Sequence, residues 1–500
     1  MSLTYEVMID RLNAGDFLDP YDDVSERVLA NPGLSVEWGR DQARSLAPPM
    51  IGACSFALNN QDGAISSEDG SSPWYQLLKP NRPFRASASR GDPIPYRSSL
   101  AYHTATPYRG VDWFPLFSGY TNGIRQLPAI GQRTVEFDAI GMAARLQRTT
   151  ISLPLSTNIR TDQAVTEVLD EVGWPADKRT LSTGDTTLRE WWVNERTAWA
   201  VLVELLASEG PGATMYEDPY GYLHFENRNY RTLASRSTTS QATFYDTADG
   251  GDLYHIAIEY DSHWEDIFNR ATLDTKRREL QSLQVVWTLG ESISPAAGTP
   301  IEIRIKTTDP FQDAVAPVLT TDYTVTGGTV STAISWTDAA STVLTVTNTS
   351  GTPVVSDLQL RAKPYTVIGE TTLEASTTLE SDADDQTHVI AAWPEMDFNQ
   401  AGAVLASAVS RYFRVRPRIS ITAVNADETH ETALLNLRVS DRITVVDDHL
   451  GLNADLYIER IRYSATAGGR IMATFDCEPV YEFPGAAWDS AIWDTSLWGV

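Results

Sequence analysis

The sequence predicts a mainly β, multidomain protein with a smaller α+β domain and an all-β insertion. Three observations predict this. Short strands separated by Gly, Pro, Asn and Asp turns occur near both ends of the chain, helical periodicity replaces them in between, and one Thr- and Val-rich stretch alternates as exposed strands do. At about 100–200 residues per domain, the 500 residues correspond to roughly three domains.

The N-terminal part, residues 1–150, is predicted to form a β-barrel domain, and its short strands and turns are equally typical of a sandwich. The segment CSFALNNQDGAIS runs from apolar residues into a turn at 59–63, where Asn, Asp and Gly accept left-handed backbone. In RTVEFDA, Val135 and Phe137 alternate with Glu136 and Asp138, which is typical of a half-buried strand.

The period then changes, and residues 151–235 are predicted to form the small α+β domain. In DQAVTEVLDEVG, Val165, Val168 and Leu169 recur at helical spacing. A second helix, TAWAVLVELLASEG, ends before Gly210-Pro211, and the following segment, 213–228, turns at its Pro and Gly as a hairpin does.

The rest of the chain predicts a second β-barrel domain that is interrupted. Its pieces are 236–285 and 366–480. The first piece begins within a Ser/Thr-rich linker predicted at 235–242, and the second includes a helix at 398–413. Between the pieces, residues 286–365 contain IEIRIKT and STVLTVTNTS, which alternate as the strands of an all-β insertion would.

The last segment, 481–500, is predicted to be a Trp-rich C-terminal arm. Trp488, Trp493 and Trp498 are five residues apart, a spacing that fits neither a helical stripe nor one face of a strand. Because tryptophan buries a large apolar area, these three residues are the candidate partner-docking residues. The alternative is that the segment folds back on its own chain.

Composition excludes several functions. Lys and Arg number 39 against 66 Asp and Glu, a net charge of −27, which argues against binding to nucleic acid phosphates or to an anionic membrane. The two cysteines, Cys54 and Cys477, cannot make a disulfide scaffold and fit assembly in a reducing cytoplasm. The N-terminus does not read as a signal peptide, and no apolar run is long enough to suggest a membrane span.

Motifs for catalysis or metal binding are missing. No Lys follows a Gly, as a P-loop requires, and the HExxH pattern that starts at His430-Glu431 has Leu at 434. A calcium loop starting at Asp10 would need oxygen ligands where Leu12 and Ala14 stand. We therefore predict no catalytic residue, no cofactor and no bound metal; a dispersed Ser-His-Asp triad is left open by the sequence.

Several segments, taken in order, resemble one family. They are YEVMID, LSVEWGRD, LNNQDGAIS, SSPWYQLLKPNRPFR, LFSGYTNGI and TVEFDAIGMAARL near the N-terminus, LLASEGPGATMYEDPYGYLHFENR in the middle, and RVSDRITVVDD with YIERIRYSATAGGRIMATFDCEP near the C-terminus. Together these segments, within 1–150, 190–230 and 430–480, resemble minor tail proteins that form the tail-tip (baseplate) hub of long-tailed actinobacterial phages. The insertion at 286–365 lies outside the resemblance.

The resemblance implies a structural virion protein. In such hubs, two tube-like barrels per chain and three chains form a pseudo-six-fold ring that continues the tail tube, so a homotrimer is implied. The implied partners are the tube, the distal tail protein, the tape-measure protein and the central fibre, for host attachment and DNA delivery. The implied location is the virion tail tip, after assembly in the host bacterial cytoplasm.

The sequence leaves alternatives open. A distal tail protein that forms a hexameric ring is a neighbouring alternative within the same structural class. A tail-borne carbohydrate-binding or cell-wall-degrading protein would need a convergent site, and 286–365 contains no His or Cys, so binding is favoured there over catalysis. The negative charge suits the wall of a channel that DNA crosses without adsorbing, and equally suits plain solubility.

Overall fold

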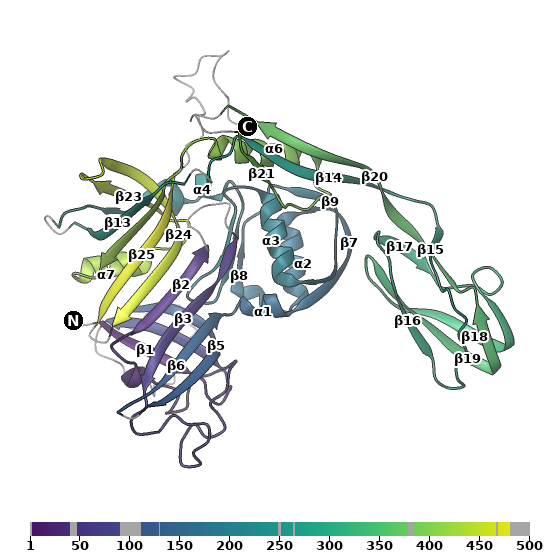
Figure 1. Cartoon of the computed structure of the whole chain (residues 1–500), viewed down its shortest axis with the longest axis horizontal. Coiled ribbons are helices and arrows are strands. Elements are labelled where there is room, and N and C mark those ends of the chain that lie inside the picture. Colours follow the sequence, from purple (N-terminus) through teal and green to yellow (C-terminus); the bar gives the residue numbers. More distant parts are fainter. Residues whose placement is uncertain are drawn as a thin grey trace.

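A computed structural model of the chain describes residues 3–40, 48–90, 112–129, 131–248, 252–263, 266–378, 385–466 and 469–480. In this part of the chain, strands far outnumber helices and form several sheets, which confirms the mainly β, multidomain fold class (Figure 1). None of the described helices is both long enough and apolar enough to cross a membrane.

The largest element is a sheet of twelve strands, and its first half comes from the N-terminal region. These strands lie in the order β1-β4-β5-β6-β3-β2, and every neighbouring pair is antiparallel. Their bounds are β1 Leu3–Ile9, β2 Leu34–Arg40, β3 Pro49–Asn59, β4 Pro83–Arg90, β5 Asp112–Ala129 and β6 Gln132–Gly141. A short 3₁₀ helix, η1 (Ser25–Arg27), lies between β1 and β2.

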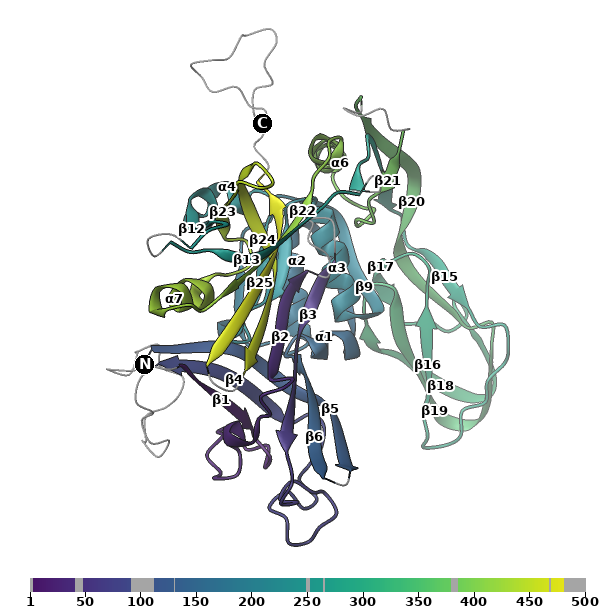
Figure 2. The same cartoon turned by 60° about the vertical axis from the view of Figure 1, so that its left-hand side comes forward.

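The second half of the sheet comes from strands on both sides of the insertion. They lie in the order β12-β23-β24-β25-β22-β13, and all pairs are antiparallel except β12 with β23. Their bounds are β12 Ser240–Phe244, β13 His255–Asp261, β22 Arg418–Val424, β23 Arg442–Asp447, β24 Leu452–Thr466 and β25 Arg470–Pro479. Strand β2 pairs with β24 and so joins the halves, as Figure 2 shows where the purple and yellow strands meet.

The predicted tube-like β-barrel domains need one correction. Among the described strands no barrel closes through a strand ladder, and one apolar core runs along both halves of the sheet. The halves form one sheet because β24 extends beyond its ladder with β23. The edge that remains free on β24 pairs with β2. Backbone contacts outside the ladders add to each half: Val24 N donates to Val7 O, Leu29 N to Ala57 O, and Tyr245 bridges Tyr254.

A second layer, called the helical layer below, contains the predicted helices of the α+β region. The predicted helix at 162–173 is confirmed as α2 (Thr161–Glu171), with Val165, Val168 and Leu169 buried, and the next as α3 (Ala198–Glu209). The accompanying elements are α1 Ala144–Arg148, β7 Thr150–Arg160, η2 Ala176–Lys178, β8 Arg179–Leu181, β9 Thr187–Thr197, β10 Thr214–Glu217 and β11 Leu223–Glu226. Strands β10 and β11 form the predicted hairpin.

The helical layer takes in residues that the sequence had assigned to the second barrel. Leu273 on β14 (Arg270–Leu280) and Val404 on α6 (Phe398–Tyr412) belong to the same buried cluster as Val168 and Leu202. Strand β20 (Gln359–Ser376) pairs with β14 over this layer, and β21 (Thr387–Val389) pairs with β14 on its other side. The helical layer therefore uses segments from both sides of the insertion.

The predicted linker at 235–242 is structured. It contains α5 (Ser235–Thr238) and the start of β12, and follows α4 (Tyr230–Leu233). Helix α7 (Glu428–Asn436) precedes β23 and begins at Asp427, whose carboxylate accepts from the backbone N–H of His430.

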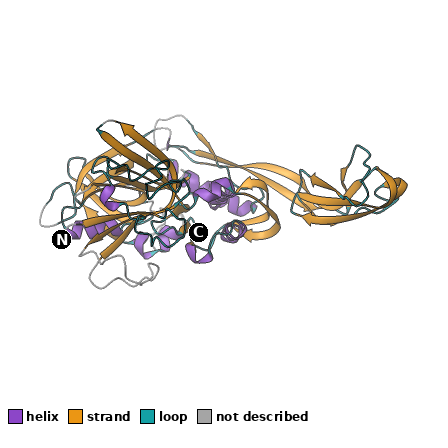
Figure 3. Ribbon diagram, turned by 90° about the horizontal axis from the view of Figure 1, so that it is seen from below, coloured by secondary structure: helices purple, strands orange, loops and turns teal. Residues whose placement is uncertain are grey.

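The insertion forms its own all-β unit at the far end of the β14–β20 ribbon (Figures 1 and 3). Strands β16, β19 and β18 make one sheet, and β15 and β17 pair with β20. A separate small core includes Ile305, Leu344 and Val355. The strands are β15 Gln284–Thr288, β16 Ile301–Lys306, β17 Phe311–Val315, β18 Thr324–Thr337 and β19 Ser341–Ser356.

Candidate functional site

The candidate site is the junction where β2 meets β24, because it makes one sheet from two halves of the chain. Six residue pairs form the antiparallel ladder, from Leu34 opposite Ala465 to Gly39 opposite Arg460. The two strands are separated by more than 400 residues in the sequence, so this pairing is long-range.

Glycine occurs at both ends of the junction ladder: Gly33 directly precedes it and Gly39 is its last residue. Gly33 has a φ of +77° and Gly39 a φ of +120°, conformations that other L-residues rarely adopt. A Cβ atom would lie 2.3 Å from the backbone oxygen of Ala465 at the first position, and 2.3 Å from that of Glu459 at the second. Only glycine therefore lets the two backbones approach this closely.

An aromatic contact fills the apolar face of the junction. The rings of Trp38 on β2 and Tyr463 on β24 lie edge to face with centroids 5.2 Å apart, a favoured aromatic geometry. The hydroxyl of Tyr463 donates to the backbone oxygen of Leu434 at 2.7 Å, so this buried polar group is satisfied.

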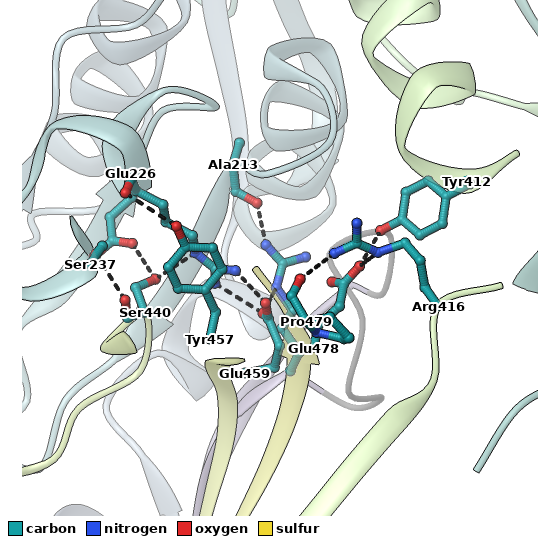
Figure 4. Close-up of polar contacts among 12 residues, drawn as sticks. Ala213, Glu226, Ser237, Tyr412, Arg416, Ser440, Tyr457, Glu459, Glu478 and Pro479 are labelled. Carbon is teal, nitrogen blue, oxygen red and sulfur yellow. Dashed lines mark hydrogen bonds and ion pairs between the residues drawn. The ribbon is translucent and has the colours of Figure 1, made fainter. Parts of the chain in front are cut away.

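A buried charge network covers the end of the junction (Figure 4). Glu459 lies at a bulge of β24, and its side chain is fully buried. Its carboxylate pairs with Arg40 at the end of β2, Nε to Oε2 at 3.0 Å, and with Arg231 of α4, Nη2 to Oε2 at 3.1 Å. Arg40 also donates to the backbone oxygen of Ala213, so β2, β24, α4 and the segment before β10 meet here.

The network continues into the α+β region through neutral and charged oxygens. Arg231 Nε donates to Ser440 Oγ at 3.2 Å, and Ser440 Oγ donates to Glu226 Oε2 at 2.6 Å. The hydroxyl of Tyr216 donates to Glu226 Oε1 at 3.1 Å. Ser237 Oγ donates to the backbone oxygen of Ser440 at 2.8 Å (Figure 4).

A separate group of contacts ties α6 to β25. Glu478 accepts from the Tyr412 hydroxyl at 3.2 Å and from Arg416 Nε at 2.8 Å, and Arg416 also donates to the backbone oxygen of Pro479 (Figure 4). The end of the second half-sheet is thereby fixed against the helical layer.

Electrostatics explains how so many charges remain buried. Burial lowers the pKa of Arg40, although the nearby Glu459 opposes this change. For Arg231, burial also opposes the charged form, but the ion pair with Glu459 outweighs it and raises the pKa. Burial raises the pKa of Glu226 despite its bond from Ser440. The network is thus a paired structural unit whose members depend on one another.

The carboxylates of the junction network are engaged within the network, by arginine, serine and tyrosine side chains. Paired in this way, they hold together the segments that meet at the junction. No group of three or more His, Cys, Asp or Glu side chains that could hold a metal occurs in the described ranges.

The structure also shows the residues of the rejected motifs. His430 lies on α7, where Nε2 contacts the backbone oxygen of Asp252 at 2.9 Å and Nδ1 lies 2.9 Å from Asp427. The carboxylate of Asp10 accepts backbone N–H bonds from Ala14 and Gly15, as in a turn. The predicted docking residues Trp488, Trp493 and Trp498 lie outside the described residues.

Sequence reasoning missed the junction. One signal for it exists in YIERIRY, where strict alternation places Glu459 on the face of the apolar Ile461 and Tyr463. A carboxylate on an apolar strand face predicts a buried cationic partner, but the alternation does not identify that partner.

Comparison with known proteins identifies structural neighbours only. No protein-family model and no curated sequence matches the chain. The tail protein from Neisseria meningitidis MC58 is similar with a TM-score of 0.49 and 10% identity, covering 96% of each chain. The 43 kDa tail protein of prophage MuSo2 from Shewanella oneidensis has a TM-score of 0.48 and 10% identity, covering 95% of this chain and 98% of its own.

A third neighbour is the prophage tail protein gp18 from Listeria monocytogenes EGD-e, with a TM-score of 0.42 and 7% identity, covering 95% of this chain and 94% of its own. These three neighbours are tail proteins, two of them from prophages. Because these TM-scores are all below 0.5, the likenesses carry no argument about the function of this chain.

Proposed function

We propose that the chain is a structural virion protein of a phage tail tip. It forms a hub ring that closes or continues the tail tube and connects the tube to the tape-measure, distal tail and fibre proteins. Host attachment and DNA delivery then depend on it mechanically, and no catalysis is assigned to it.

One observation carries this proposal: two β half-sheets of one chain join edge to edge into a single continuous sheet. A protein that continues a tube must extend a sheet around an axis, and strand pairing at edges is the means by which sheets are extended. The ordered sequence resemblance to tail-tip hubs supports the same function. A homotrimer follows from the proposal, because three chains with two half-sheets each match a six-fold tube.

The experiment is quantitative mass spectrometry of purified virions together with electron microscopy of their tails. The proposal expects the chain in virions at three copies per tail, at the tip. Six copies in one ring would favour a distal tail ring protein instead, and absence of the chain from virions would overturn the structural function.

A second candidate, carbohydrate binding through the insertion, is favoured by one cleft. This cleft, of about 510 Å³, lies between the helical layer and the insertion and is lined by Trp336, Arg304 and Glu195, among others. An exposed tryptophan beside charged hydrogen-bonding groups can stack on a sugar ring and bind its hydroxyls. Binding to host cell-wall polysaccharide that disappears in Trp336→Ala would support this candidate.

A further inference from the structure

The two half-sheets are copies of one arrangement. Numbered by their order along the chain, the six strands of each half lie side by side as 1-4-5-6-3-2. Strand β2 of the first half thus corresponds to β13 of the second, and β5 corresponds to β24. The halves differ at the first strand, because β1 is antiparallel to β4 whereas β12 is parallel to β23.

The correspondence extends to single residues. The β5–β6 ladder is irregular between Thr121 and Gly123 and ends at Ala129, and the β24–β25 ladder is irregular between Ile458 and Arg460 and ends at Thr466. Gly123 follows the first irregularity and lies six positions before Ala129, and Arg460 follows the second and lies six positions before Thr466. Matching these landmarks aligns Ile124-Arg125 with Ile461-Arg462, and Phe137-Asp138 with Phe475-Asp476.

The internal junction uses two strand edges, and the repeat supplies a second copy of each. At the junction, β2 of the first half pairs with residues 460–465 of β24 in the second half. The corresponding surfaces are the outer edge of β13 and residues 123–128 of β5. Among the described residues, no strand pairs with either edge, since β13 pairs only with β22, and β4 ends opposite Tyr120 of β5. On β13, Ile256 and Tyr260 are 48% and 50% exposed.

We propose that β13 of one copy of the chain pairs with residues 123–128 of β5 in a second copy, in the register of the internal junction. The partner is thus a second copy of this chain, and the proposal rests on the ring proposed above. Leu34 lies opposite Phe56 and Phe56 opposite Phe137, just as Ile258 lies opposite Ile421 and Ile421 opposite Phe475, so Leu34 aligns with Ile258. This alignment places Ile258 opposite Pro128, Tyr260 opposite Gln126 and Asp261 opposite Arg125. The pairing is antiparallel, so the alternation of strand direction continues from copy to copy.

Charge supports this register. In the internal junction, Glu37 lies opposite Arg462, and the alignment places Asp261 opposite Arg125 in the same positions. Opposite charges on facing strands stabilise a ladder, whereas like charges destabilise it. The Arg125 side chain is 73% exposed and lies 3.5 Å from Glu136, and that of Asp261 is 55% exposed and lies 2.7 Å from His263. Both contacts are at the surface, so each side chain can turn to a partner strand.

The contact between copies lacks the strongest part of the internal junction. The bulge residue Glu459, which pairs with two arginines, corresponds to Asn122 on β5. The side chain of Asn122 accepts from Arg148 Nη2 at 3.2 Å, and a neutral amide cannot replace a buried carboxylate. The contact between copies is therefore weaker than the junction within the chain, and the isolated chain stays monomeric until a template aligns the edges.

Cysteine cross-linking in assembled tails tests the register. Directly opposed residues on antiparallel strands have Cβ atoms about 4.5–5.5 Å apart, close enough for a disulfide after small adjustments. The test variant is Gln126→Cys with Tyr260→Cys. The matched control is Gln126→Cys with Ile256→Cys, because position 256 is four residues away, or about 13 Å along the strand. The native Cys54 and Cys477 are buried.

Mild oxidation of purified tails should give disulfide-linked chains up to a trimer with the 126/260 pair, and at least tenfold fewer with the 126/256 pair. Exchanging the charges should act in the same way: Arg125→Asp should reduce incorporation into tails, and Asp261→Arg added to it should restore incorporation. Tails that contain the chain but give no 126/260 cross-link would overturn the pairing and leave the proposed function standing. Absence of the wild-type chain from tails would overturn the function itself.

Discussion

Removing the central carboxylate of the junction network should destabilise the protein strongly. In Glu459→Gln, the guanidinium groups of Arg40 and Arg231 would keep their places, with side chains only 2% and 6% exposed, but would lose their anion. Breaking a buried ion pair by removing one partner costs about 3–5 kcal/mol, because the remaining charge is left uncompensated away from water. We expect a loss of this size in the free energy of unfolding.

Urea denaturation at pH 7 measures the total loss, and hydrogen exchange followed by mass spectrometry locates it. Peptides from β2 and β24 should exchange faster in Glu459→Gln, whereas peptides from the insertion should not change, since the insertion has its own core. The matched control is Glu370→Gln, which breaks a surface pair with Lys276 at 3.1 Å, and a loss below about 1 kcal/mol is expected there.

A double-mutant cycle separates charge from packing. Adding Arg231→Met to Glu459→Gln removes one of the two orphaned charges, so the combined loss should be smaller than the sum of the single losses. The reasoning fails if Glu459→Gln loses less than about 1 kcal/mol, the size expected of a surface pair. It also fails if the two losses simply add.

Three further predictions concern the backbone, the pH and the insertion. Gly39→Ala should cost about 1–3 kcal/mol of unfolding free energy from its φ alone. As a control, Gly402→Ala in α6, where no atom lies within 4 Å of the added Cβ, should stabilise the protein by up to about 1 kcal/mol. The midpoints of urea denaturation measure both effects, and equal effects would contradict the role of Gly39. Burial raises the pKa of Glu217 from 4.5 to about 8. Its stabilising contribution is therefore complete below about pH 4.5 and is lost as the pH rises through about 8. The fall in unfolding free energy between pH 5.5 and 8.5 should be smaller in Glu217→Gln, and an unchanged slope would show that this carboxyl does not cause the fall. Replacing residues 286–365 by a short Gly/Ser linker should leave a soluble, folded remainder, because the β14–β20 ladder brings Leu280 next to Tyr365. If the shortened chain lost its near-ultraviolet circular dichroism, the insertion would instead belong to the core.

Local patterns were enough to predict much of the secondary structure. The helical spacing of Val165, Val168 and Leu169 and the alternation of Val135 and Phe137 correspond to α2 and β6, because both patterns depend on neighbours within a few residues. The division of strands among domains was harder. Leu273 and Val404 are apolar in either arrangement, and no local pattern shows that they pack on α2 and α3 instead of in a barrel.

The junction could not be predicted because its specificity lies in pairs distant in sequence. Leu34 pairs with Ala465 from the other end of the chain, and the two backbones approach closely only because residues 33 and 39 are glycines. The buried Arg40, Arg231 and Glu459 come from three separate segments, and each alone looks like an ordinary charged residue. The predicted docking site at Trp488, Trp493 and Trp498 stays a prediction.

The repeat explains why one of two equivalent contacts should be permanent and the other conditional. Within the chain, β2 and β24 are covalently connected, and the Glu459 network adds buried ion pairs that need precise geometry. Between copies, the corresponding edges at β13 and residues 123–128 would have Asn122 in place of that carboxylate and a rim pair, Asp261 with Arg125, whose exposure makes it worth less. A ring protein gains from this asymmetry, because two half-sheets that are always joined fix the geometry of the next contact, while weak edges prevent premature polymerisation. Replacing Asn122 by a carboxylate would therefore not strengthen the ring by itself, since the counterparts of Arg40 and Arg231 would also be required.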